Sequence, residues 1–301
     1  MSPDGGLLPL LKPPGPSSRQ LVDAVGRLAG PRVRAGHAGT LDPAAAGVLV
    51  VGLGRATRLL GFLQSAEKRY RFELVLGSTT DTGDATGRPL DRHDASGVTH
   101  AQVDAVLGGF TGRIRQRAPL YSARRVDGQH LYTYARRGEP VEAPEFEVDV
   151  HTLAMVGWDA GDPAVALCDL RCGSGTYVRA LAEAIGERVG CGAHTGMLLR
   201  LEAGGITAAQ CHTLEEIEAA AADGILADRL LAPETALAFL PAVDLSAAEA
   251  ERVRHGIPPA PRPGGGRGVV RLVDPGGALV AVAEEVGVEG IRLRCVLAAG
   301  A

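Results

Sequence analysis

The sequence predicts an α+β fold, built on a mixed, mainly antiparallel sheet flanked by helices. Segments with helical spacing and segments with strand-like alternation both occur, but they do not alternate in the βαβ order that produces a parallel sheet. The chain has 301 residues, of which 46% are hydrophobic and 22% charged. That length and composition suit one large globular domain followed by a small one.

The N-terminal quarter of the chain shows clear periodicity. Apolar residues recur at helical spacing through residues 18–29, directly after serines that can cap a helix, and this predicts a helix. The apolar run at 48–53 predicts a buried strand, and residues 55–63 predict a short helix. Residues 69–76 alternate polar and apolar side chains, which predicts a strand with one buried face.

The middle of the chain continues with mixed elements and no internal repeat. Residues 80–95 are polar and rich in turn formers, so we expect a loop there. Helices are expected at 101–107, 131–137 and 176–189, and strands are expected at 145–156 and 165–172.

The last part of the chain predicts a small β-rich module. The acidic, alanine-rich residues 215–221 predict a surface helix, and Pro233 and Pro241 bracket an expected linker. Short strands are expected at 269–273, 279–283 and 291–297, with a loop rich in proline and glycine at 258–268. The predicted domains are therefore residues 1–236 and residues 237–301.

Charge is distributed unevenly along the chain. The formal net charge of −4 does not by itself favour a nucleic-acid partner. Residues 112–138 nevertheless contain seven arginines and one acid, whereas residues 211–250 contain eight acids and one arginine. A phosphate-binding face needs local positive charge, and it does not require a positive net charge over the whole chain. The arginine-rich stretch therefore favours RNA contact over a solvated face with scattered salt bridges.

Cysteine usage and the lack of a targeting segment favour a cytoplasmic protein. The cysteines are Cys168, Cys172, Cys191, Cys211 and Cys295; their number is odd and no pair is spaced C-x-x-C, so reduced thiols are expected. A zinc site on the first two would lack a second pair of ligands. No apolar run approaches the roughly 20 residues that cross a bilayer, and the N-terminus has no basic cluster typical of a secretory signal.

A glycine-rich turn holds the most informative carboxylate. Asp42 lies in the octapeptide Gly36-His37-Ala38-Gly39-Thr40-Leu41-Asp42-Pro43, just ahead of the predicted buried strand. The following proline biases Asp42 toward an extended backbone, and the glycines allow conformations that other residues resist. A carboxylate aimed from such a turn can act as a nucleophile or a base. It can also serve only to accept hydrogen bonds from turn amides.

The octapeptide resembles the GHxGxLDP motif of the TruB family of tRNA pseudouridine synthases. Further blocks similar to that family follow its order: Lys12 to Ser18 (K-P-x-G-x-[ST]-S), Lys68-Arg69-Tyr70 (K-x-Y), residues 76–84 (LG-x-x-T-D-T-x-D), Tyr121-Ser122-Ala123 (Y-S-A), residues 131–138 (Y-x-x-A-R-x-G), residues 172–179 (C-x-x-G-T-Y-[IV]-R) and residues 192–201 (A-H-x-x-x-L-x-R). One block is a weak signal. A series in order, spread over about two thirds of the chain, is specific.

The resemblance implies a pseudouridine-synthase-like sheet and a PUA-like RNA-binding module at residues 237–301. It implies an isomerase that converts uridine 55 in the T-loop of tRNA to pseudouridine. That reaction exchanges a C1′–N1 bond for a C1′–C5 bond without redox change, so we expect no metal and no organic cofactor. The sequence has none of the common phosphate-loop, zinc or dinucleotide motifs. The expected partner is the T-stem-loop of tRNA, no membrane is involved, and the expected state is a monomer.

The resemblance also implies roles for individual residues. Asp42 is the implied catalytic carboxylate, either as nucleophile toward C6 of the base or C1′ of the sugar, or as base toward C2′. Arg179 is the implied partner that opposes the rise in pKa caused by burial. The target uridine must be swung out of its stack before it can react, and a flipped base needs an aromatic face. Tyr70 is the implied stacking residue, which also helps the final loss of the C5 proton.

Three further residues complete the implied pocket. Tyr177 is the implied second substrate-contacting tyrosine, His37 the histidine near the displaced base, and Leu198 an apolar wall of the uracil pocket. Without the resemblance, a turn histidine and a plain core leucine would be the simpler interpretations. For Lys12, support of the pocket or contact with the RNA backbone competes with the common case of an exposed lysine near a terminus.

The chain departs from the family pattern at two places. Ala44-Ala45-Ala46-Gly47 stands where the family often has Leu-Ala-Thr-Gly, which removes a bulky side chain and a hydroxyl. Leu199-Arg200 stands where the family has two arginines, which removes one candidate phosphate contact.

Other functions are disfavoured by particular residues. A guide-RNA-dependent synthase of the dyskerin type is a second hypothesis, disfavoured because the chain lacks lysine-rich tails. A non-catalytic RNA-binding protein would not need the carboxylate, tyrosines and arginine together. A metal-dependent nuclease would need clustered carboxylates, for which Asp81 and Asp84 are the only hint. The threonines around these two acids favour a hydrogen-bonded loop instead.

Overall fold

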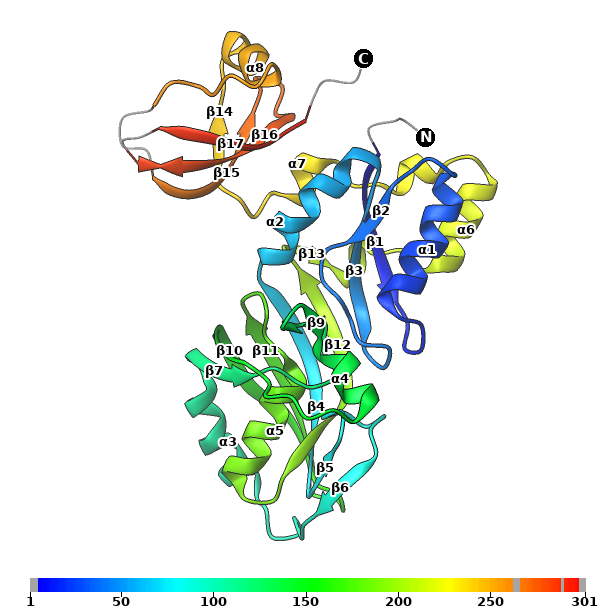
Figure 1. Ribbon diagram of the computed structural model, residues 1–301, viewed down its shortest axis with the longest axis vertical. Helices are drawn as coiled ribbons and strands as arrows, with labels where there is room; N and C mark the ends of the chain where they lie inside the picture. The colour runs from blue at the N-terminus through cyan, green and yellow to red at the C-terminus, as the bar shows by residue number, and fades with distance from the viewer. Residues whose placement is uncertain (1–4, 262–265, 288–289, 298–301) are drawn as a thin grey trace. The chain divides into compact units, whose positions relative to one another are not determined.

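The computed structural model describes residues 5–261, 266–287 and 290–297, and its chain divides into two units. Unit one comprises the chain up to residue 43, residues 47–66 and the chain from residue 203 onward; unit two comprises residues 44–46 and 67–202. Figure 1 shows the elements of both units. The expected loop at 258–268 has four residues, 262–265, outside the described part.

Unit one begins with a three-stranded arrangement around β3 (Ala46–Leu53). β1 (Gly6–Lys12) pairs antiparallel with β3, from Gly6 opposite Leu53 to Lys12 opposite Gly47. β2 (Ala35–His37) also pairs antiparallel with β3. Lys12 and β2 therefore lie toward opposite ends of β3.

The first helix of unit one follows the rule for an amphipathic helix. α1 (Ser18–Ala29) starts at Ser17, whose side chain and that of Gln20 form a capping box. Its apolar face packs into a core that it shares with β1, β3 and α6 (Leu214–Ala222). The remaining short elements are η1 (Gly54–Leu59), α2 (Leu60–Ser65), β13 (Ile206–Thr207), η3 (Ala208–Gln210), η4 (Leu226–Arg229) and α7 (Pro233–Ala236).

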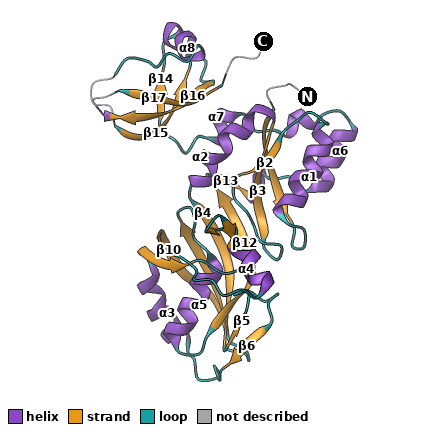
Figure 2. Cartoon of the chain, viewed as in Figure 1, coloured by secondary structure: helices purple, strands orange, loops and turns teal. Residues whose placement is uncertain are grey.

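The C-terminal part of unit one forms a separate four-stranded sheet with its own core. Its strand order is β14 (Ala242–Asp244), β15 (Arg267–Val273), β16 (Leu279–Val286) and β17 (Ile291–Val296). β14 and β15 are parallel, and the other neighbours are antiparallel. α8 (Ala247–Arg254) lies beside this sheet (Figure 2). Its residues Ala250 and Val253 belong to the core of the sheet.

Unit two contains a five-stranded run ordered β12 (Ala193–Ala203), β4 (Lys68–Leu76), β11 (Val165–Cys172), β10 (Glu145–Asp159) and β7 (Gly112–Arg117). The pairs β4–β11, β11–β10 and β10–β7 are antiparallel. α3 (His100–Leu107) and α5 (Val178–Val189) contact each other; α5 also contacts β4 and β7, and α3 contacts β10 (Figure 1). Two short hairpins, β5–β6 (Ser78–Thr80, Pro89–Arg92) and β8–β9 (Arg125–Val126, Gln129–His130), and α4 (Leu131–Arg137) complete it.

The predicted α+β class is confirmed, with a mainly antiparallel sheet, flanking helices and a C-terminal β module. The helices expected at 18–29, 101–107, 131–137, 176–189 and 215–221 are present, as are all the predicted strands. No helix in the described ranges is both long and apolar enough to cross a membrane.

Several local expectations are wrong. The segment 80–95 is not only loop, because it contains β6 and closes a hairpin with β5. The expected helix at 55–63 is two pieces, η1 followed by α2, and the expected linker after Pro233 begins with α7. The periodicity did not predict β1, β7, β12 or α8.

Candidate active site

The backbone on both sides of Asp42 is fixed by residues near the N-terminus. The buried Ser18 hydroxyl donates to the Leu41 carbonyl and accepts from the Leu41 amide, both at 2.9 Å. On the other side, Lys12 Nζ donates to the Pro43 carbonyl at 3.0 Å, and the Gly15 amide donates to the same oxygen at 2.8 Å. Asp42 therefore sits between two anchored residues, which restricts the directions that its carboxylate can take.

Lys12 is not an exposed terminal lysine. It is the last residue of β1, and its exposed fraction is 0%. The ammonium group is satisfied by the carbonyls of Pro13 and Pro43, each at 3.0 Å. A buried charge without such partners would be costly. The structure thus gives Lys12 a supporting role at the Asp42 turn.

The turn itself uses glycine where the backbone requires it. Gly39 has a φ of 102°, a conformation that L side chains rarely adopt. His37 is the last residue of β2, pairs with Val51 and is half-buried. The following residue, Ala38, donates from its amide to the Val50 carbonyl at 2.9 Å. His37 and Asp42 therefore belong to one turn of unit one, five residues apart.

Replacing Ser18 with alanine is expected to slow the pseudouridine formation expected of this chain about 10- to 100-fold, because a small misplacement of a reacting group lowers a rate by about that factor. It would also leave two buried backbone groups without partners, which lowers the free energy of unfolding by about 1–3 kcal/mol. Ser17→Ala is the matched control, since it removes the helix cap, worth about 1 kcal/mol, without touching Leu41. Single-turnover rates and denaturant unfolding of both variants test this. Equal rates in the two variants would contradict it.

Arg179 of unit two is buried and its guanidinium is hydrogen-bonded, so it is not a surface helix arginine. Its exposed fraction is 5%. Nη1 donates to the Thr82 carbonyl at 2.6 Å and Nη2 to the Tyr121 carbonyl at 3.0 Å. Nε lies 3.9 Å from Oδ2 of Asp84. The loop that contains Thr82 and Asp84 and the segment at Tyr121 thus fix the orientation of this side chain at the first turn of α5.

The loop that holds Arg179 is built on aspartate hydrogen bonds, as its threonines predicted. Asp84 Oδ1 accepts from Thr82 Oγ1 at 2.8 Å and from the amide and hydroxyl of Thr86 at 3.0 and 2.6 Å. Asp81 Oδ1 accepts from the Arg88 amide at 2.8 Å. Within the described residues, no group of His, Cys, Asp and Glu side chains is arranged to hold a metal ion.

Tyr177 is positioned by a residue that the sequence did not single out. Gln116 on β7 is buried; its Oε1 accepts from the Tyr177 amide at 3.1 Å and its Nε2 donates to the Tyr177 carbonyl at 3.3 Å. The Tyr177 ring meets Phe146 edge to face, with centroids 6.0 Å apart, and the Arg124 guanidinium lies 3.8 Å above Phe146. Tyr177 is also the N-cap residue of α5, so this clamp places the helix start that carries Arg179.

Tyr70 and Leu198 lie on adjacent strands of unit two, β4 and β12. Tyr70 is 8% exposed, and Leu198 is half-buried. Two residues before Tyr70, Lys68 is also buried, and burial, followed by the charge of Arg200, lowers the pKa of Lys68 to about 8. Buried cations on these two strands were not anticipated, although Lys68 and Arg200 both fall inside the recognised motifs.

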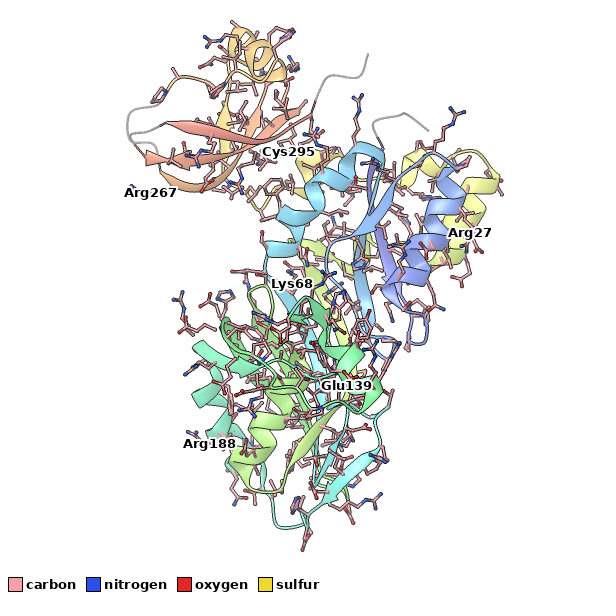
Figure 3. All side chains as sticks on the ribbon, viewed as in Figure 1. Arg27, Lys68, Glu139, Arg188, Arg267 and Cys295 are labelled. Atoms are coloured by element: carbon pink, nitrogen blue, oxygen red, sulfur yellow. The ribbon has the colours of Figure 1, made fainter. Side chains whose placement is uncertain are left out.

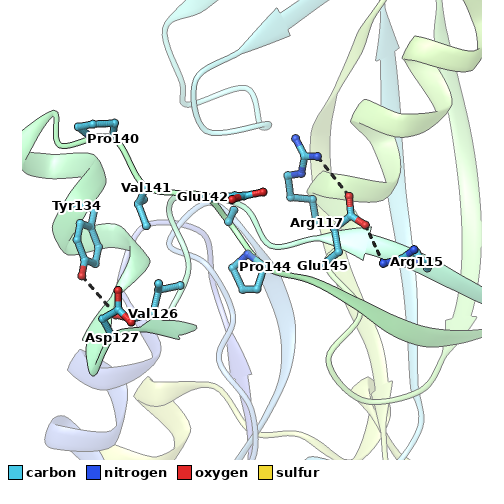
Figure 4. A pocket seen from close by; sticks show the side chains of 11 residues that line it. Arg115, Arg117, Val126, Asp127, Tyr134, Pro140, Val141, Glu142, Pro144 and Glu145 are labelled. Atoms are coloured by element: carbon cyan, nitrogen blue, oxygen red, sulfur yellow. Dashed lines mark hydrogen bonds and ion pairs between the residues drawn. The ribbon is translucent and has the colours of Figure 1, made fainter.

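The arginines of β7 do not form an uncompensated basic face. Arg113, Arg115 and Arg117 are exposed, but the neighbouring strand β10 supplies acids to each of them: Glu147 and Asp149 contact Arg113, and Glu145 contacts Arg115 and Arg117. The two ion pairs of Glu145 border a groove of about 720 Å³ (Figure 4). That groove also contains Asp127 and Glu142. The expectation that this stretch lacks compensating acids is therefore wrong for its three β7 arginines, and the groove is a poor phosphate site.

The predicted site residues are divided between the units. Asp42 and His37 belong to unit one, and Tyr70, Tyr177, Arg179 and Leu198 belong to unit two. The structure holds the backbone around Asp42 and the guanidinium of Arg179 independently. The ion pair between them stays a prediction.

Comparison with known proteins identifies the family. Residues 27–178 match the family model described as TruB family pseudouridylate synthase, N-terminal domain, and residues 179–238 match the tRNA pseudouridylate synthase B C-terminal domain. The chain is 44% identical over 284 residues to a tRNA pseudouridine synthase B of Thermobifida fusca, covering 93% of this chain and 94% of that one. The chain belongs to the TruB family of pseudouridylate synthases.

Other relatives agree with this membership of the TruB family. A tRNA pseudouridine synthase B of Pelotomaculum thermopropionicum is 43% identical over 254 residues, covering 83% of this chain and 80% of that protein. The fold resembles that in the crystal structure of a Cbf5-Nop10-Gar1 complex, with a TM-score of 0.77 and 26% identity over 99% of this chain and 85% of the other. The TruB-family chain thus shares its architecture with a chain of that complex.

Proposed function

We propose that this enzyme converts uridine 55 in the T-loop of tRNA to pseudouridine. Membership of the TruB family makes it a tRNA pseudouridine synthase, and relatives at 43% and 44% identity carry that name. The observation that carries the assignment of chemistry to Asp42 is its anchored turn, fixed at Leu41 and at Pro43. A residue that only satisfied turn amides would not need its neighbours held from β1 and α1.

The proposed reaction balances without a cofactor. The C1′–N1 bond breaks, a C1′–C5 bond forms, the C5 proton leaves and N1 gains a proton. Asp42 acts as nucleophile at C6 or C1′, or as base at C2′, and each role requires an ionised carboxylate. Arg179 is proposed as its ion-pair partner, since a fixed guanidinium favours the charged form of a nearby carboxyl.

The remaining site residues are proposed to bind the flipped base. Tyr70 provides an aromatic face for the uracil and assists the loss of the C5 proton. Tyr177 makes the second aromatic contact, supported by the Gln116 clamp and by Phe146. His37 lies near the displaced base, and Leu198 forms an apolar wall.

The substrate and setting are proposed as follows. The enzyme acts on the T-stem-loop of tRNA as a monomer in the cytoplasm, without a bound metal. Residues 237–301 are proposed to form a PUA-like RNA-binding module, distinct from the catalytic domain of residues 1–236. The separate sheet of β14 to β17, with its own core of residues such as Leu272 and Val280, supports this division. Leu279, Val282 and Cys295 of the same sheet also pack into the core of β1 and β3.

A guide-RNA-dependent activity is less well supported. The similarity to the chain from the Cbf5-Nop10-Gar1 complex is 26% in sequence, against 43% and 44% for the tRNA pseudouridine synthase B relatives. Action on tRNA by the protein alone is the interpretation that these identities favour.

Incubation of the purified protein with unmodified tRNA transcript, in the presence of a chelator, tests the proposal. We expect nearly complete pseudouridine formation at position 55 by nucleoside mapping, and none in a transcript that carries cytidine there. Modification at another position, or a requirement for an added guide RNA, would overturn the assignment.

A further inference from the structure

Unit one carries a second group of arginines, which differs from the β7 group. From residue 26 to residue 58 the chain has Arg27, Arg32, Arg34, Arg55 and Arg58 and a single acid, Asp42. All five arginines are exposed. In a chain with a net charge of −4, this is a marked local excess of positive charge.

The backbone brings the segments that carry these arginines together. Arg34 directly precedes β2, and its carbonyl accepts from the Gly54 amide at 2.8 Å, so the start of η1 lies beside it. Arg55 and Arg58 are three residues apart in η1, where side chains at that spacing are eclipsed. Arg27 lies in the last turn of α1, which contacts β2 (Figure 3). We call Arg32 and Arg34 the β2-entry surface.

Two of these arginines have no acidic partner among the residues that the structure describes. Within the described parts of the chain, neither Arg32 nor Arg34 forms an ion pair or a side-chain hydrogen bond. By contrast, every arginine of β7 has an acid on β10. An exposed arginine that is already paired has little to gain from a phosphate, whereas an unpaired one keeps its full charge and its five donors.

The β2-entry surface lies well away from the anchored turn of Asp42. Lys12, which holds Pro43, is opposite Gly47 at the start of β3, whereas Ala35, next to Arg34, is opposite Leu53 at its end. Six residues of strand at about 3.3 Å each separate the two ends by roughly 20 Å. A ligand that reaches both places must be an extended polyanion rather than a single nucleotide.

We propose that the β2-entry surface binds the phosphate backbone of a tRNA stem, several base steps from the reacting uridine. This inference rests on the proposed function for the identity of the RNA. An arginine guanidinium can donate two parallel hydrogen bonds to the oxygens of one phosphate. Contacts of this kind position the nucleic acid without reading its sequence. The surface thus supplies affinity and register, and the pocket supplies the chemistry.

The double variant Arg32→Ala/Arg34→Ala tests the surface, with tRNA binding measured at several salt concentrations. Loss of two phosphate contacts should reduce the slope of log K against log salt by about 1.4 to 1.8, and should weaken binding about fivefold or more near 0.1 M salt. Arg113→Ala/Arg115→Ala removes the same charge from paired arginines and should leave the slope nearly unchanged. Arg32→Lys/Arg34→Lys should restore most of it. Arg27 stays intact because its charge also favours the C-terminus of α1.

The outcomes separate this inference from the proposed function. If the wild-type protein modifies tRNA but both alanine variants bind it with the salt slope of the wild-type protein, the surface is not a phosphate site, and the proposed function stands. If the wild-type protein binds tRNA without modifying it, the proposed function fails, while the slopes still decide the surface. Unchanged thermal unfolding midpoints confirm that the variants are folded.

Discussion

Asp42→Asn is expected to reduce pseudouridine formation at least about 1000-fold, which corresponds to about 4 kcal/mol of activation free energy. The amide has nearly the same shape as the carboxylate, but it is a poor nucleophile and a poor base. Because Leu41 and Pro43 are anchored through the backbone, the turn should keep its geometry. Binding of tRNA should therefore stay within about tenfold, or about 1.4 kcal/mol.

Single-turnover conversion of tRNA and equilibrium binding of the same RNA measure the two effects separately. Asp23→Asn is the matched control, since that carboxylate lies on α1 in the same unit and pairs with the exposed Arg19. The control should react at the wild-type rate. Full turnover by Asp42→Asn would remove the chemical basis of the proposed function.

Tyr70→Phe is expected to bind tRNA within about threefold of wild type and to react about 100-fold more slowly, the range typical of a lost proton-transfer group. The ring that is proposed to stack on the uracil is kept, and only the hydroxyl that is proposed to assist proton loss is removed. Tyr70→Ala should also lose affinity, because stacking of one base on an aromatic ring contributes about 1–3 kcal/mol. Rates, dissociation constants and unfolding midpoints of both variants distinguish these effects.

Phe72→Leu controls for packing around Tyr70. Phe72 is fully buried and lies two residues further along β4, on the same side of the strand. This substitution should lower the free energy of unfolding, but it should leave unchanged the rate constant with which bound tRNA is converted. If Tyr70→Phe reacts as fast as wild type, or if Phe72→Leu slows the reaction equally, Tyr70 is a structural residue.

Capping and periodicity rules predicted the elements that are stabilised mainly by residues close together in the sequence. The helix at 18–29 has its cap, its capping box and its apolar stripe within a dozen residues, so its sequence is sufficient. β12 was missed because Gly196 and the buried Arg200 interrupt its pattern of alternating polar and apolar residues. β1 was missed because Pro9 argues against a strand; β1 ends the strand order, a position in which proline is tolerated.

Features that depend on distant residues could not be predicted. The burial of Lys12 requires a carbonyl 31 residues away, at Pro43. The neutralisation of the β7 arginines requires acids that come about 30 residues later, on β10. A charge count along the sequence does not register such partners. For the same reason, the sequence motifs pointed to Tyr177 but not to Gln116, which holds it from β7.

The hydrogen bonds of Lys12, Gly15 and Ser18 have a practical meaning for anyone who shortens or tags this enzyme. None of these three residues is proposed to meet the uridine, yet together they hold the backbone on both sides of Asp42, the proposed reactive carboxylate. A chain trimmed to begin after Ser18 would still possess every group that is proposed to touch the base. It would have lost the hydrogen bonds that position Asp42, which is one of those groups.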